Sequence, residues 1–263
     1  MPAVKTRGHF VWYELATSDP AAAQRFYSAI TGWGTQAFEG SSTPYTMWIN
    51  GENPIGGVWQ LQSELASQGI PPHWLPYIST DDIEETVGEA TQLGARVFVP
   101  PTDIPNMGRF AVLTDPQGAF FALFRGAQDQ PEPEFKPQLG DASWHELTTT
   151  DHVAAFDFYH KLLGWEKQSE MDMGGGSIYL MYGRSAGSPM LGGMWTWNRP
   201  EHTMPPNWMT YFKVEDADKT AERIKELGGQ ILNGPMEVPG GDRVAQALDP
   251  QGAAFGIHSS PKK

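Results

Sequence analysis

The sequence contains two copies of one motif, "WYELATSDPAAAQRFYSAITGW" at residues 12–33 and "WHELTTTDHVAAFDFYHKLLGW" at residues 144–165. Each copy starts with Trp, has Glu two positions later, continues through Asp and Phe-Tyr, and ends on Gly-Trp. Residues 74–124 align in the same way, without a gap, with residues 208–258, and both stretches contain "DPQGA". Identity at this density indicates a tandem duplication, which decides the architecture.

The two copies are joined by "GAQDQPEPEFKPQLGD" at residues 126–141, which is rich in Pro, Gly and charged residues. Such a composition without hydrophobic periodicity is typical of a linker. We therefore predict a first domain at residues 1–127, a linker at 128–139 and a second domain at 140–263.

The order of elements within one copy can be predicted from the pattern of residues. Asp19 is a good N-cap, Pro20 suits the first helical turn and Gly32 ends the helix. A second capped helix is expected at residues 81–94, and "DPQG" at residues 115–118 suits a type I turn within a hairpin. Alternating or β-branched segments predict strands at residues 9–17, 45–50, 55–62, 74–80, 95–99, 109–114 and 119–124.

Each copy therefore reads as two βαβββ units. Four such units predict an α+β fold with two open, curved mixed sheets that form cups, and with helices outside.

These motifs resemble the vicinal oxygen chelate superfamily, which holds the glyoxalases, bleomycin-resistance proteins and extradiol dioxygenases. The resemblance rests on Asp19…Phe26-Tyr27…Gly32-Trp33, on its second copy and on the two "DPQGA" turns, and it covers nearly the whole chain. It is strongest to two-domain glyoxalase-like proteins of bacteria. The superfamily includes many chemistries and some proteins that only bind, so the resemblance implies the fold more firmly than the activity.

Members of this family typically hold a divalent metal inside each cup through His and Glu side chains. Alignment on the motifs places the ligand positions at residues that cannot chelate a hard cation: Trp12, Leu75 and Ala122 in the first copy, and Trp144, Met209 and Gly256 in the second. We therefore expect neither the family metal nor another cofactor.

Glu14 and Glu146 are the candidate catalytic residues. Strand alternation places each on the same face as Trp12 or Trp144, inside the cup. A carboxylate in an aromatic cavity is costly to bury unless it is paired, so it is a candidate acid, base or hydrogen-bond acceptor for a ligand. The alternative is a structural Glu that pairs with Arg109, Arg243 or backbone N–H groups.

The candidate ligand-binding residues are aromatic or cationic: Trp12, Tyr77, Arg109, Phe120, Trp144, Tyr211 and Arg243. The Tyr hydroxyls can donate hydrogen bonds and the Arg residues can bind a carboxylate in bidentate fashion. The tyrosines can instead reach the rim and the arginines can form salt bridges. We expect His145 to face the helices, whereas His258 follows the inward parity in the second copy alone. Gly256 and Ala254 predict a roomier second cup than Phe120 and Ala122.

The composition excludes several classes of function. The chain of 263 residues has no Cys, which removes disulfides, thiolate metal sites and a Cys nucleophile. A net charge of −13 without a basic run argues against nucleic acid. There is no apolar run of the roughly 20 residues that a membrane span needs. We expect a cytoplasmic protein with a small-molecule ligand, and homo-oligomerisation is left open.

Three functions remain. The first is a metal-independent protein that binds a small, partly aromatic molecule in one or both cups, as a sequestering or resistance-type binder. The second is a lyase, isomerase or hydroxylase of the glyoxalase class in which Glu14 or Glu146 handles a proton. The third is an interaction scaffold.

Overall fold

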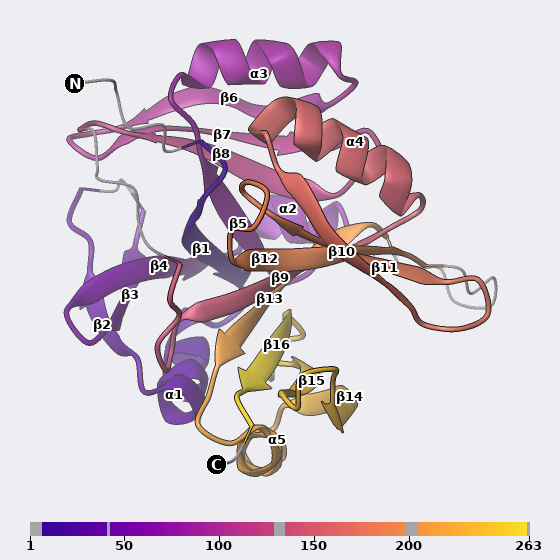
Figure 1. The fold of residues 1–263 in the computed structure, drawn as a ribbon. Helices are drawn as coiled ribbons and strands as arrows, with labels where there is room; N and C mark the ends of the chain where they lie inside the picture. Colours follow the sequence, from indigo (N-terminus) through magenta and orange to yellow (C-terminus); the bar gives the residue numbers. More distant parts are fainter. Residues whose placement is uncertain (1–6, 41–42, 129–134, 198–204, 262–263) are drawn as a thin grey trace. The chain divides into compact units, whose positions relative to one another are not determined.

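The computed structural model describes residues 7–40, 43–128, 135–197 and 205–261 (Figure 1). These residues form two eight-stranded sheets, one from each copy of the repeat. The elements of the first copy are β1 (Phe10–Thr17), α1 (Pro20–Thr31), β2 (Gly34–Ala37), β3 (Tyr45–Asn50), β4 (Asn53–Gln60), α2 (Ser63–Ser67), β5 (His73–Ser79), α3 (Ile83–Gln92), β6 (Arg96–Ile104), β7 (Gly108–Thr114) and β8 (Phe120–Gly126). Those of the second are β9 (Ala142–Thr149), α4 (His152–Leu163), β10 (Glu166–Asp172), β11 (Ile178–Gly183), β12 (Met190–Thr196), β13 (Asn207–Lys213), α5 (Ala217–Glu226), β14 (Gln230–Glu237), β15 (Arg243–Leu248) and β16 (Ala254–Ser259).

The two sheets have the same topology. Their strand orders are β2-β3-β4-β1-β5-β8-β7-β6 and β10-β11-β12-β9-β13-β16-β15-β14. The first strand of each βαβββ unit lies parallel to its fourth, and the remaining strands of the unit pair antiparallel. The predicted α+β fold with duplicated βαβββ units is therefore confirmed. Sequence patterning missed the edge strand β2, whose residues are all exposed, and the short helix α2.

The chain packs into two compact units, called unit 1 and unit 2, and each joins segments of both copies of the repeat. Unit 1 contains the described parts of Met1–Val11, Pro76–Phe135 and His145–Trp208. Unit 2 contains Trp12–Leu75, Lys136–Trp144 and the described part of Met209–Lys263. Each of these two compact units thus combines one βαβββ segment from the first copy with one from the second. The domain boundaries expected at the linker stay a prediction, and residues 129–134 of that linker lie outside the described residues.

The helices of the duplicated motif begin and end as the sequence predicts. The Asp19 side chain accepts a hydrogen bond from the backbone N–H of Ala22, and Gly32 ends α1 in the left-handed conformation with φ of 81°. Asp151 and Gly164 do the same for α4, where Gly164 has φ of 74°. A residue without Cβ is needed at both C-terminal positions because this conformation is strained for others.

The Phe-Tyr and "DPQG" motifs meet in the core of unit 2. The Tyr27 hydroxyl of α1 donates to Asp249 Oδ2 at 3.1 Å and accepts from Trp74 Nε1 at 2.9 Å. Asp249 Oδ1 accepts backbone N–H bonds from Gln251 and Ala253, which closes the turn. Burial raises the pKa of both Tyr27 and Asp249. A tyrosine from the first copy therefore fastens a turn from the second.

Unit 1 repeats this arrangement with the copies exchanged. The Tyr159 hydroxyl donates to Asp115 Oδ2 at 3.2 Å and accepts from Trp208 Nε1 at 3.0 Å. The Gly-Trp that ends each motif also belongs to the core: Trp165 Nε1 donates to the Gly8 carbonyl at 2.9 Å. All three aromatic side chains are at most 6% exposed. The sequence motifs that identify the repeat are thus the residues that pack and form hydrogen bonds in the core.

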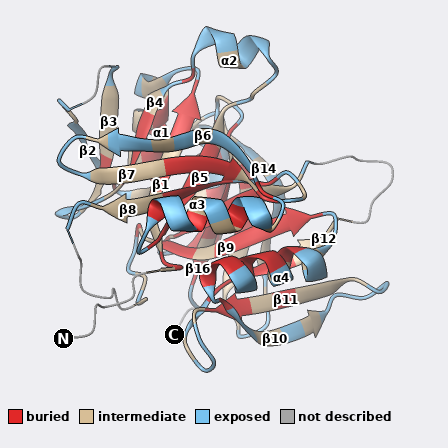
Figure 2. Ribbon diagram, turned by 90° about the horizontal axis from the view of Figure 1, so that it is seen from above, coloured by how far each residue is buried: buried red, intermediate tan, exposed pale blue. Residues whose placement is uncertain are grey.

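The helices cover one face of their sheets. In unit 1, α3 packs on β6, β7 and β8, as Figure 1 shows. Its buried positions Ile83, Thr86 and Ala90 recur at helical spacing, and Figure 2 shows α3 and α4 buried on one side and exposed on the other. Within the described residues, none of the helices is long and apolar enough to cross a membrane.

Candidate functional site

Glu14 on β1 is held by two aromatic donors in unit 2. Its Oε2 accepts from the Tyr45 hydroxyl on β3 at 3.0 Å, and its Oε1 accepts from Trp59 Nε1 on β4 at 2.9 Å. All three side chains are half-buried. Hydrogen bonds to a charged acceptor favour its ionised form, so this arrangement holds a carboxylate among aromatic rings.

A third aromatic residue extends this network. Trp12 Nε1 donates to the Tyr45 hydroxyl oxygen at 2.9 Å, so Trp12 and Glu14 lie on the same face of β1, as strand alternation predicts. Burial raises the pKa of Tyr45, and the negative charge of Glu14 raises it further. Tyr45 therefore stays protonated and donates its hydrogen to the carboxylate.

The Gly-Gly pair of β4 makes room for this network. Tyr45 lies opposite Trp59 in the β3–β4 register, and its ring crosses the strand at Gly57. A Cβ at Gly57 would collide with the Tyr45 ring and hydroxyl, and one at Gly56 would collide with the Tyr13 carbonyl. Both glycines are therefore required by a close approach of other atoms.

The second copy preserves the central hydrogen bond. In unit 1 the Tyr179 hydroxyl of β11 donates to Glu146 Oε2 on β9 at 2.8 Å, and Glu146 is 8% exposed. A Cβ at Gly193 would collide with the Tyr179 ring, just as a Cβ at Gly57 would collide with the Tyr45 ring. Trp195, the equivalent of Trp59, packs edge-on against Trp197 with ring centroids 5.4 Å apart.

A pocket of about 600 Å³ adjoins the Glu14 network in unit 2. Trp59 lines it together with residues just before β3, at the end of β4, in the β4–α2 connection and in α2: Thr43, Pro44, Gln60, Leu61, Gln62, Ser63 and Glu64. The indole that donates to Glu14 therefore also forms a wall of the pocket. A cavity of this size accommodates a small organic molecule.

The residues at the family's metal-ligand positions do not fit a metal. Leu75 and Met209 are apolar and each 8% exposed, and Trp12 uses its N–H as a donor. At Gly256 a ligand side chain has no room, because a Cβ would collide with the Tyr211 ring. In the part of the chain that the structure describes, no group of three His, Cys, Asp or Glu side chains is arranged to hold a metal ion.

Tyr211 also bears on the expected size of the second cup. The space that Gly256 leaves is taken by the Tyr211 ring, so this glycine does not widen the site as its small size suggested. The Tyr211 hydroxyl accepts a hydrogen bond from Gln246 Nε2 at 2.7 Å. In unit 1 its counterpart Tyr77 is 4% exposed and packs near Phe110 with ring centroids 6.2 Å apart.

The two candidate arginines are engaged in ion pairs. Arg243 forms a bidentate pair with Asp218, with N–O distances of 2.7 and 2.6 Å. Arg109 pairs with Asp103 at 2.6 Å and with Glu84 at 2.7 Å. Salt bridges, one of the two interpretations of these residues, are therefore present at both.

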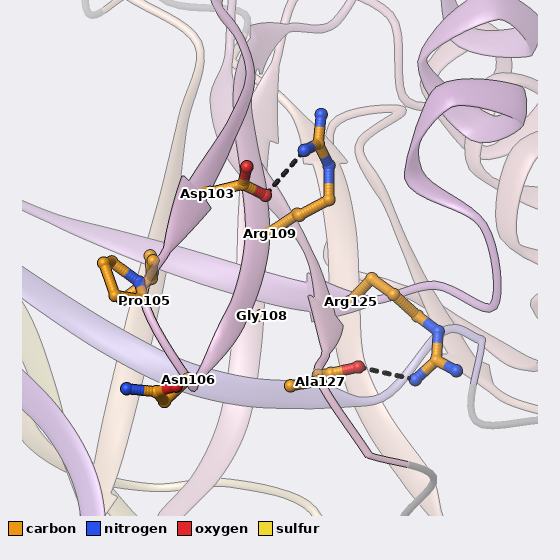
Figure 3. A pocket seen from close by; sticks show the side chains of 9 residues that line it. Asp103, Pro105, Asn106, Gly108, Arg109, Arg125 and Ala127 are labelled. Atoms are coloured by element: carbon orange, nitrogen blue, oxygen red, sulfur yellow. Dashed lines mark hydrogen bonds and ion pairs between the residues drawn. The ribbon is translucent and has the colours of Figure 1, made fainter.

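Arg109 also lines a second pocket, of about 410 Å³, in unit 1. Figure 3 shows Asp103 joined to Arg109, while the guanidinium of Arg125 points away from that of Arg109. Arg125 donates to the carbonyls of Asp81 and Gly126. Because the two guanidinium groups diverge and already have protein partners, they form no convergent anion clamp. The remaining candidates are Phe120, which is 41% exposed and contacts Phe98, and Trp144, which is half-buried on β9.

His145 is buried among core residues, and whether it faces the helices stays a prediction. It is 1% exposed, stacks on Phe10 with ring centroids 3.6 Å apart, and its Nδ1 lies 2.9 Å from the Leu191 carbonyl. Burial lowers its pKa to about 3.

The structure also shows a polar group in unit 2 that sequence reasoning missed. His258 Nδ1 lies 2.9 Å from Ser143 Oγ, and His258 Nε2 lies 3.3 Å from Asp242 Oδ2. Ser143 is 7% exposed and its hydroxyl also lies 3.3 Å from the Tyr211 carbonyl. A catalytic nucleophile must be accessible to its substrate, whereas the Ser143 hydroxyl is buried. The arrangement is therefore better suited to holding neighbouring strands together than to acyl transfer. The parity of His258 was the one available sequence signal.

Two family models cover most of the chain. The model "Glyoxalase/Bleomycin resistance protein/Dioxygenase superfamily" matches residues 142–257, and the model "Glyoxalase-like domain" matches residues 12–124. Among curated relatives, the "Putative glyoxylase CFP32" of Mycobacterium tuberculosis is 33% identical over 249 residues, which cover 94% of this chain and 92% of the relative. The "Anthracycline biosynthesis protein DnrV" of Streptomyces peucetius is 31% identical, with 94% and 91% covered.

Solved structures show the same fold at low identity. The Mn(II)-bound glyoxalase from Novosphingobium aromaticivorans aligns with a TM-score of 0.65 and 13% identity over 98% of this chain and 84% of that one. The 2,3-dioxygenase LapB from Pseudomonas sp. KL28 aligns with a TM-score of 0.66 and 11% identity over 100% and 94%. The duplicated βαβββ units, both family models and these relatives together show that the chain belongs to the glyoxalase/bleomycin resistance protein/dioxygenase superfamily.

Proposed function

We propose that this protein binds a small, partly aromatic organic molecule beside Glu14, without the metal of its family. The observation that carries the proposal is the Glu14 carboxylate, held by Tyr45 and Trp59 next to a pocket of about 600 Å³. Half-buried aromatic side chains offer flat apolar contact, and the Glu14 carboxylate fixes the Trp59 indole that forms a wall of the pocket.

The relatives support a ligand of this kind. DnrV and DauV, a protein of Streptomyces sp. strain C5, are both named as anthracycline biosynthesis proteins. DauV is 30% identical to this chain over 261 residues. Anthracyclines are planar polycyclic aromatic compounds, which match the aromatic surroundings of Glu14.

The absence of the family metal is a separate part of the proposal. Its support is that Trp12, Leu75 and Ala122 stand at the ligand positions of the first copy. Elemental analysis of protein purified without chelators tests it. Substoichiometric Fe, Mn, Ni and Zn are expected, and one tightly held equivalent of any of them would contradict this part.

Ligand binding is tested by thermal shift and calorimetry with a panel of planar aromatic compounds. A bound compound raises the melting temperature with its concentration. Glu14→Gln keeps an acceptor oxygen but removes the charge that holds the Trp59 indole, so affinity should fall by about tenfold, as for the loss of one hydrogen bond to a charged group. Glu146→Gln is the matched control in the other copy. Wild-type affinity in Glu14→Gln would contradict a role for this carboxylate, and an equal loss of affinity in Glu146→Gln would show that the effect does not belong to this pocket.

An enzyme of the glyoxalase class is the second candidate, with Glu14 or Glu146 as acid/base. It is favoured by the donors at both carboxylates, since they stabilise the ionised form that a proton acceptor requires. Turnover should be lost in Glu14→Gln or Glu146→Gln while folding is retained. Unchanged turnover in the double variant would exclude this mechanism.

A further inference from the structure

The pocket beside Trp59 in unit 2 has an uneven distribution of charge. Among the described residues that line it, Glu64 is the one ionisable side chain, and Lys, Arg and His are missing from that set. Glu64 lies in the first turn of α2 and is exposed, with its Oε2 3.2 Å from the Ser63 hydroxyl. A negative charge therefore lines an exposed part of the pocket, without a cation among the lining residues that the structure describes.

A second negative charge lies behind the wall of the same pocket. Glu14 Oε1 accepts the indole N–H of Trp59 at 2.9 Å, and Trp59 lines the pocket. An indole that donates its N–H to a carboxylate is polarised, so that electron density increases on its ring. The negative potential of an aromatic face attracts cations, and the added density strengthens this attraction.

The polar groups of the Glu14 network add to this preference. The Tyr45 hydroxyl hydrogen already points to Glu14 and the Trp12 N–H points to Tyr45, so these donors are engaged within the protein. An anionic ligand would meet the charge of Glu64 beside the Glu14-bound indole, with no basic group among the described lining residues. The net charge of −13 lowers the local concentration of anions further.

We propose that the pocket lined by Trp59 and Glu64 selects an organic cation, whose aromatic or aliphatic ammonium group lies against the Trp59 indole in the pocket that Glu64 also lines. This inference rests on the proposed function and specifies the charge of its ligand. The amides of Gln60 and Gln62 at the rim supply hydrogen-bonding groups for polar substituents. A neutral molecule of the same shape gains the stacking contact alone.

Calorimetric titration with three probes of similar shape tests the charge. The probes are N-methylacridinium, acridine at a pH where it is neutral, and anthracene carboxylate. We expect N-methylacridinium to bind about tenfold more tightly than acridine, the ratio that a partly desolvated cation–π contact supplies. Anthracene carboxylate should bind weakest, and added salt should reduce the difference.

Variants locate the site of this preference. Glu64→Gln removes a charge from an exposed position and should weaken N-methylacridinium several-fold while leaving acridine unchanged. Glu52→Gln makes the same charge change in the exposed β3–β4 turn, outside the residues that line the pocket, and should change neither. Trp59→Leu should abolish the preference, and its circular dichroism spectrum checks that it folds.

The outcomes separate the two proposals. If acridine or anthracene carboxylate binds as tightly as N-methylacridinium, the cation preference is wrong while aromatic binding stands. If Glu52→Gln weakens the cation as much as Glu64→Gln does, the preference belongs to the net charge and not to this pocket. If no probe binds, both the inference and the proposed function fail.

Discussion

His145 makes the stability of unit 1 sensitive to acid. Its imidazole is 1% exposed, stacks on Phe10 with an interplanar angle of 3°, and lies 2.9 Å from the Leu191 carbonyl through Nδ1. Burial lowers its pKa to about 3, because desolvation penalises the charged ring. The ring is therefore neutral in the folded protein, and Nδ1–H donates to Leu191.

The magnitude follows from the difference between folded and unfolded states. An unfolded histidine titrates near pH 6.5, so this contribution to stability is fully present above that pH. It is lost as the pH falls toward the folded pKa of about 3. Each pH unit within this window is worth about 1.4 kcal/mol, so acidification from pH 6.5 to pH 4 removes roughly 3 kcal/mol of unfolding free energy.

Urea unfolding of the wild type and His145→Asn across this range tests the reasoning. An Asn amide can replace the Nδ1–H donor but does not titrate, so the variant has a constant deficit without the acid slope. The difference between the two proteins should shrink by roughly 3 kcal/mol between pH 6.5 and pH 4. Burial raises the pKa of Asp115, so its contribution is lost with rising pH; that opposite effect cancels in the difference.

A control and a contrary result complete this experiment. His160→Asn removes an imidazole whose side chain is 44% exposed on α4, and it shows what the loss of one ring does without deep burial. Parallel pH profiles for the wild type and His145→Asn would refute the claim that His145 is buried in its neutral form.

Three further outcomes are expected. Tyr27→Phe leaves the buried indole N–H of Trp74 and a carboxylate without their partner, which should lower the unfolding free energy by about 2–4 kcal/mol in urea titrations; a loss under about 0.5 kcal/mol would contradict the network. Gly57→Ala brings a Cβ against Tyr45 and should cost about 1–3 kcal/mol and weaken ligand binding, whereas Gly88→Ala in α3, where nothing lies near the new Cβ, should stabilise by about 0.5–1 kcal/mol; equal effects of the two in urea titrations would exclude the close approach. Dialysis against a chelator should leave the melting temperature unchanged, and a drop in melting temperature that Mn²⁺, Fe²⁺, Ni²⁺ or Zn²⁺ restores would reveal a bound metal.

Local signals in the sequence were sufficient for most elements of the fold, but not for the exposed edge strand β2 and the short helix α2. The caps at Asp19 and Gly32 act within a few residues, so the local sequence alone is enough to locate α1. Alternation likewise places Trp12 and Glu14 on one face of β1. The partners of Glu14 were not predictable, because Tyr45 and Trp59 reach it through the register of β3 and β4, which long-range pairing sets.

The tyrosine and turn motifs show the same limit at a larger distance. Tyr27 and Asp249 are 222 positions apart, and the sequence shows that both belong to a repeat without showing that each binds the other copy's partner. The small size of Gly256 suggested space, whereas the Tyr211 ring fills it. Volume at one position is a poor guide where a neighbouring aromatic ring can move in.

The exchange of βαβββ units between the copies has a consequence for how this chain can change over generations. Tyr27 of the first copy donates a hydrogen bond to Asp249 of the second, and Tyr159 of the second donates one to Asp115 of the first. The loss of any of these residues from one copy therefore damages a core to which both copies contribute. The positions at which the family resemblance implies metal ligands, such as Trp12 and Leu75, are not part of these tyrosine–aspartate contacts. Substitution at those positions can therefore proceed while the duplicated scaffold is retained, so that the ligand of such a protein can change without a change of fold.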